Sequence, residues 1–88
     1  MKIREEIFNE VLELCHKGTT FMFIDITDEI QFNIVIQPFY AIMDGCAWNW
    51  KTEEETEMRK VAKTGEFEDD LYYLIDLLIE DAKVAQMV

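Results

Sequence analysis

The chain has 88 residues, of which 50% are hydrophobic and 12% aromatic, enough for one small domain with a dense core and too few for two domains. Its 19 acids and 8 bases give a formal net charge of −11, which disfavours direct binding to nucleic acid or to an anionic membrane surface. Cys15 and Cys46 lie far apart and form no paired motif, so we expect reduced thiols in a cytoplasmic protein.

The first predicted element is an amphipathic helix from Lys2 to Lys17. Gly18 follows it, at the position where a left-handed C-terminal cap is expected. The helix is predicted because apolar side chains recur at spacings of four, four and three residues, in the order Ile3, Ile7, Val11 and Leu14.

Two strands are predicted next. Residues 19–27, TTFMFIDIT, are rich in Thr, Phe and Ile and lose the helical period. Residues 30–37 alternate, and Pro38 ends the run because proline cannot donate to a strand ladder. One side of this second strand is apolar and the other mostly polar, which is typical of an antiparallel sheet with one packed face. The apolar side consists of Ile30, Phe32, Ile34 and Ile36, and the other of Gln31, Asn33, Val35 and Gln37.

The segment FYAIMDGCAWNWK is predicted to add one further strand, or two if it forms a hairpin. Asp44-Gly45, flanked by apolar residues, is a typical two-residue hairpin turn. Asp44 is also the only charged residue between Ile30 and Trp50. The block around Trp48 and Trp50 therefore belongs either to the core or to a partner surface.

Two trailing helices complete the predicted fold. Thr52-Glu53-Glu54-Glu55 fits a capping box, which predicts a helix from Thr52 that stops at Gly65. A last helix from about Phe67 to Gln86 has a clear apolar stripe. We therefore expect a single α+β domain over residues 1–88, with a leading helix, an antiparallel sheet of three or four strands, and two trailing helices. All helices are expected on one face of the sheet.

No residue pattern predicts catalysis, a cofactor or a specific metal. His16 is the only histidine and has no nucleophile or orienting acid near it in sequence, and Cys46 has no basic neighbour to lower its pKa. The acids at residues 25–29 and 66–70 lack the alternating ligands and central glycine of a calcium loop. We expect a non-enzymatic protein with no cofactor and no metal site.

The last helix carries the most distinctive pattern. Its segment GEFEDDLYYLIDLLIED, residues 65–81, has seven carboxylates and no base, so its acids cannot form the i,i+4 ion pairs that usually decorate a solvated helix. Tyr72, Tyr73, Leu77 and Ile79 extend its apolar and aromatic surface beyond one stripe. The side facing away from the core is either a solubilising face or a binding surface for a basic protein. The predicted partner-binding residues are Glu66, Asp69, Asp70, Tyr73, Asp76 and Glu80.

A small acidic chain with this element order and the acid-aromatic run GEFEDDLYYLIDLL resembles the phage-encoded anti-CRISPR proteins that inhibit type II effector nucleases. The resemblance implies an acidic surface that imitates DNA phosphates and occupies the basic groove of a CRISPR effector, in the cytoplasm of the host cell. The alternative is a homodimeric structural or regulatory subunit. Its interface would use the apolar arc of the last helix and the block around Trp48 and Trp50.

Overall fold

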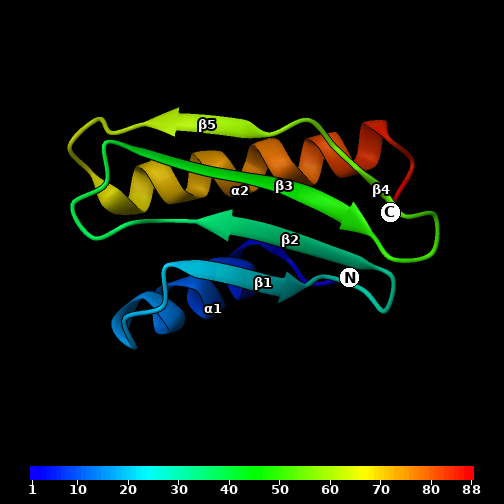
Figure 1. Cartoon of the computed structure of the whole chain (residues 1–88), viewed down its shortest axis with the longest axis horizontal. Helices are drawn as coiled ribbons and strands as arrows, with labels where there is room; N and C mark the ends of the chain where they lie inside the picture. The colour runs from blue at the N-terminus through cyan, green and yellow to red at the C-terminus, as the bar shows by residue number, and fades with distance from the viewer.

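The order of elements is one helix, five strands and one helix (Figure 1). A computed structural model describes all of residues 1–88. Neither helix combines the length and the apolar composition that crossing a membrane requires. The elements are α1 (Arg4–His16), β1 (Phe21–Asp25), β2 (Ile30–Val35), β3 (Ile42–Asn49), β4 (Glu54–Glu55), β5 (Arg59–Ala62) and α2 (Phe67–Val84).

The strands form one antiparallel sheet. β2 pairs with β1 on one side and with β3 on the other, while β4 and β5 share the far edge of β3. Both helices lie on the same side of the sheet: α1 packs against β1, and α2 against β3 and β5 (Figure 1). The predicted α+β class, with the helices on one face, is confirmed.

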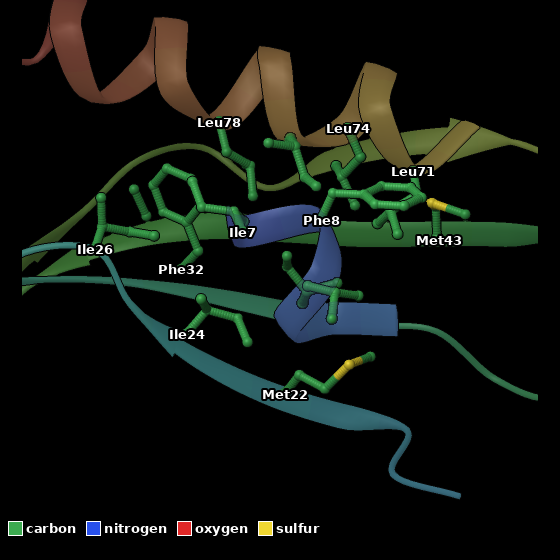
Figure 2. Close-up of a cluster of buried hydrophobic side chains, with 14 of the residues drawn as sticks. Ile7, Phe8, Met22, Ile24, Ile26, Phe32, Met43, Leu71, Leu74 and Leu78 are labelled. Carbon is green, nitrogen blue, oxygen red and sulfur yellow. The ribbon is translucent and has the colours of Figure 1, made fainter. Parts of the chain in front are cut away.

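Alternation along the strands decides which side chains the helices cover. The covered side of β1 and β2 buries Met22, Ile24, Phe32 and Ile34 completely or almost so. These side chains meet a stripe from α2 that includes Leu71, Leu74 and Leu78, and the α1 residues Ile7 and Phe8 (Figure 2). The period-2 pattern of residues 30–36 and the helical periods of residues 2–17 and 67–86 therefore identified most of the core, although Ile3, the first residue of the predicted stripe, is 58% exposed. Gly18 has the positive φ, 83°, that its predicted capping position requires.

Gly45 lies within β3, on the side of the strand that faces Leu78 of α2. A Cβ atom at this position would come within 2.9 Å of the Asn33 carbonyl oxygen and 3.1 Å of Leu78 Cδ1. Asp44 is likewise internal to β3, opposite Lys60 of β5. The hairpin turn predicted at Asp44-Gly45 is therefore wrong, because the glycine provides space between layers and not turn geometry.

The helix predicted from Thr52 to Gly65 is also wrong. The Asn49 side-chain oxygen accepts hydrogen bonds from the backbone N–H groups of Lys51 (2.9 Å) and Thr52 (3.2 Å), which ties Thr52 into a turn after β3. The residues beyond this turn pair with β3 as β4 and β5. The domain consequently has five strands and one trailing helix, in place of the three or four strands and two trailing helices that we expected.

Thr56 connects β4 to β5 without leaving the edge of β3. Its backbone N–H donates to the Ala47 carbonyl, and its hydroxyl accepts from the Ala47 N–H, both at 2.9 Å. Only Val61 of β5 is buried. An edge strand with one buried side chain has too little apolar surface to produce a period-2 pattern in the sequence.

Candidate functional site

The outer side of α2 carries five of the six predicted partner-binding residues in exposed positions. We term this set the acidic stripe: Glu66, Asp69, Tyr73, Asp76 and Glu80. Glu66 immediately precedes the helix, and Tyr73 keeps 59% of its surface. α1 has four acids and one base, and α2 has six acids and one base, so the two helices hold −8 of the net charge of −11.

Asp70 does not belong to the exposed surface, contrary to our prediction. It is 2% exposed, and its Oδ2 accepts hydrogen bonds from the Tyr40 hydroxyl (2.9 Å) and the Thr64 backbone N–H (3.1 Å). The Thr64 hydroxyl donates to Oδ1 at 2.6 Å. The hydrogen bonds, led by that from the Thr64 hydroxyl, lower the pKa of Asp70 against the opposing effect of burial. Burial, together with the bond to Asp70, raises the pKa of Tyr40 to about 12. Asp70 therefore fastens the start of α2 to the segments before β3 and after β5.

Bases from other elements neutralise two acids of α2. Arg4 of α1 donates from Nε and Nη2 to the two carboxylate oxygens of Asp76, at 2.8 and 3.0 Å. Arg59 of β5 makes the same two-bond contact with Asp81, at 2.7 and 2.8 Å, which lowers the pKa of the Asp81 carboxyl. The absence of bases within residues 65–81 therefore does not leave every acid unpaired. The acids of this segment without an ion pair are Glu66, Glu68, Asp69 and Glu80, apart from the buried Asp70.

The apolar arc of α2 is largely used inside the molecule. The Tyr72 ring stacks on Phe8 with centroids 4.1 Å apart and an interplanar angle of 2°, and the Arg4 guanidinium lies 4.2 Å from its centroid. Leu77 and Ile79 are half-buried against the core. Tyr73 and, at the end of the helix, Val84 remain as its exposed large apolar side chains, so α2 offers little apolar surface for a dimer.

The other side of the sheet is not covered by either helix, and we term it the open face. The strand register sets most of its side chains in three rows, and Ile42 and Ala62 form a short further row at the end of β3 and β5. Phe21 and Phe23 of β1, and Trp50 just beyond β3, are exposed at 54%, 57% and 58%. Exposed aromatic side chains that share a sheet face form an apolar patch of the kind that marks an interaction surface. The first row is Phe21, Val35, Asp44 and Lys60; the central row is Phe23, Asn33 and Cys46; the third row is Asp25, Gln31, Trp48 and Glu55.

An open pocket of about 400 Å³ lies on this face, lined by Phe23, Gln31, Asn33, Trp48 and Trp50. The two indole rings meet edge to face with centroids 5.8 Å apart. Asn33 Oδ1 and Trp48 Nε1 are buried and have no hydrogen-bond partner. Each unsatisfied buried polar atom costs about 1–3 kcal/mol. The sequence pointed to both tryptophans, but the pocket also depends on β1 and β2, whose register the sequence did not predict.

The residues considered for catalysis and metal binding lie apart from one another. No group of three or more His, Cys, Asp or Glu side chains is placed to hold a metal ion. Cys46 is buried in the central row with its Sγ 3.9 Å from a Glu55 carboxylate oxygen; burial, and then the charge of Glu55, raises the pKa of this thiol. His16 is exposed at the end of α1. Cys46 is therefore a protonated thiol at neutral pH and not an activated nucleophile.

In comparisons with known proteins, no family model, no curated protein and no solved structure matches this chain.

The acidic stripe and the open face lie on opposite sides of the sheet (Figure 1), so one molecule can use both surfaces at the same time.

Proposed function

We propose that the protein is a non-enzymatic interaction protein whose acidic stripe binds a basic, nucleic-acid-handling protein and thereby inhibits or regulates it. The observation that supports this proposal is the set of exposed carboxylates without ion pairs, Glu66, Asp69 and Glu80, around the exposed ring of Tyr73. Binding through these carboxylates breaks no intramolecular ion pair. The tyrosine adds contact area at low conformational cost.

The charge distribution of the protein explains how a basic partner would be attracted and bound. A net charge of −8 concentrated in the two helices steers a basic surface toward one side of the molecule and raises the rate of association. Once carboxylates occupy a groove lined with lysine and arginine, DNA phosphates can no longer enter it. Inhibition by this route is competitive with DNA and weakens with salt, because both ligands depend on the same charges.

A type II CRISPR effector is the partner that the resemblance to anti-CRISPR proteins implies. The single trailing helix differs from the element order on which that resemblance was based. The acidic stripe is the feature that still supports it. A partner of this class presents a basic groove that reads a short DNA duplex, which fits an acidic, aromatic-containing surface.

The test reverses charge at Glu66, Asp69 and Glu80, each to Lys. Asp76 is left unchanged because it is paired with Arg4, and Asp70 because it is buried. The two substitutions in the first turn oppose the helix dipole and cost about 0.3–1 kcal/mol each, so folding is verified by circular dichroism. A matched control reverses three other exposed acids, Asp28, Glu29 and Glu53, which lie in turns and give the same change in net charge.

The measurement is competition for a purified, guide-loaded type II effector against a labelled duplex that carries the motif it reads. We expect the wild-type protein and the turn control to displace the duplex. The stripe variant should bind at least about tenfold more weakly, a difference of about 1.4 kcal/mol. Raising the ionic strength above about 0.1 M should weaken the wild-type complex. Equal behaviour of the two variants, or a complex that DNA does not displace, would contradict the proposal and leave the stripe as a solubilising surface.

A further inference from the structure

We propose that the open face binds a second copy of this chain about a two-fold axis that runs along the central row, Phe23, Asn33 and Cys46. This inference is independent of the acidic stripe, which lies on the other side of the sheet. Two features of the open face support it: exposed aromatic rings, and the unpartnered atoms Asn33 Oδ1 and Trp48 Nε1.

Charge distinguishes between the occupants that could cover this face. The three rows contain three acids and one base, so the face is too negative for phosphates and too weakly charged to select a basic protein. A second copy fits because each chain keeps its acidic stripe on the far side. Packed sheets lie about 10 Å apart and each helix adds a layer about 10 Å thick, so the acidic stripes of the two copies lie about 30 Å from each other. This separation is well beyond the ~8 Å Debye length of physiological salt, so the two stripes repel each other little.

The register makes the open face complementary to itself about this axis. Rotation about the central row places the first row of one chain over the third row of the other, strand on strand. Lys60 then faces Glu55 of the second copy, and symmetry repeats the pair. Neither side chain has an ion pair within its own chain. A two-fold axis parallel to the strands would instead bring Asp25 over Glu55, two like charges, and is disfavoured.

The same axis offers partners to both unpartnered atoms. Asn33 lies on the axis and meets its own copy, so the two amides can exchange N–H···O bonds and each Oδ1 gains a donor. Asp44 faces Trp48 of the second copy and supplies an acceptor for its indole N–H. Both atoms are buried in the single chain, so these bonds require side-chain rotation, which is common when proteins associate.

The chain contains its own reporter for this interface. Its two tryptophans, Trp48 and Trp50, both line the pocket on the open face. We expect light scattering and sedimentation equilibrium to give a dimer at about 100 μM, with the tryptophan emission shifting to longer wavelength as dilution exposes the rings. Because the interface is mainly apolar, the dimer should persist in 1 M salt.

Exchanging the charges of Lys60 and Glu55 tests the position of the proposed two-fold axis. Lys60→Glu alone, or Glu55→Lys alone, brings like charges together twice and should weaken association at least about tenfold. Combining Lys60→Glu with Glu55→Lys should restore the dimer, because each pair is re-formed with its signs exchanged. Phe23→Ser should also dissociate the dimer. Tyr73→Ser is the matched control, since it removes an aromatic ring of similar exposure from α2 and should leave the dimer intact.

Several results would overturn the proposal. These are a wild-type chain that stays monomeric at about 1 mM, a folded double variant that does not regain the dimer, and a dimer that survives Phe23→Ser but not Tyr73→Ser. Tryptophan quenching by a single-stranded oligonucleotide, without dimerisation, would assign the face to stacked bases instead. The variant with Glu66, Asp69 and Glu80 changed to Lys should dimerise normally, so this proposal and the proposed function can fail separately.

Discussion

Phe32 and Phe23 lie on neighbouring strands of one sheet, yet Phe32 is completely buried and Phe23 keeps 57% of its surface. The same contrast separates the two faces of the sheet. The covered face packs against α1 and α2 (Figures 1 and 2). The open face carries aromatic side chains of similar size that remain exposed. Apolar character alone therefore does not locate the core of this protein. The position of the helices does.

Removing one aromatic ring from each face should affect stability very differently. Phe32→Ala should lower the free energy of unfolding by about 3–5 kcal/mol, because it leaves a cavity beneath both helices. Phe23→Ala should cost less than about 1 kcal/mol, because its ring is already hydrated in the single chain. Urea denaturation at low micromolar concentration, where association is minimal, measures both. Equal losses would mean that the open face is covered even in the monomer.

Gly45 and Asp44 provide a second pair, on the two faces of β3. Gly45→Ala should cost about 1–3 kcal/mol, because the added methyl group meets Leu78 and the backbone of β2. Asp44→Ala, on the open face, should change stability by no more than about 0.5 kcal/mol. Thermal unfolding of the two variants measures both changes in stability. A neutral Gly45→Ala would show that α2 can move away from the sheet at little cost.

Asp70, the buried acid of α2, should contribute slightly more to stability than its exposed neighbour Asp69. Asp70→Asn should lower the melting temperature more than Asp69→Asn, because it weakens the hydrogen bonds from Tyr40 and Thr64. The folded-state pKa of Asp70 is lowered, so its stabilisation is present above the unfolded pKa of about 3.9 and is lost as pH falls through the folded pKa. Melting temperatures measured between about pH 7 and pH 2 should therefore converge for wild type and Asp70→Asn at the acid end. A difference that did not change with pH would argue against an ionised Asp70 in the folded state.

Much of the fold could be predicted from the sequence, because α1, β2 and α2 each bury one side and so show a period. β5 shows none, since Val61 alone is buried there and its place is set by pairing with β3. The capping-box pattern at Thr52 is a local preference, and the turn formed by Asn49 overrides it. Tertiary pairing decided both cases, and no short window of sequence contains that information.

The candidate surfaces were predictable to different degrees. The acidic stripe follows from helical spacing, apart from Asp70, whose burial depends on Tyr40 thirty positions away in the sequence. The partners of Asp76 and Asp81 lie on other elements for the same reason. The open face was visible only as an uncharged block around Trp48 and Trp50. Its rows and its pocket depend on the register of three strands.

The ion pair between Arg4 and Asp76 joins residues 72 positions apart, from the first and last elements of the chain. The strand pairs, in contrast, all join segments close in sequence, so during synthesis they can form soon after they leave the ribosome. The helix that covers β3 and β5 comes last, and until its 18 residues emerge both faces of that part of the nascent sheet are exposed to water. The docking of α2 can thus occur only after the strands that it covers have been synthesised. Before that step the chain is most open to chaperones and to aggregation.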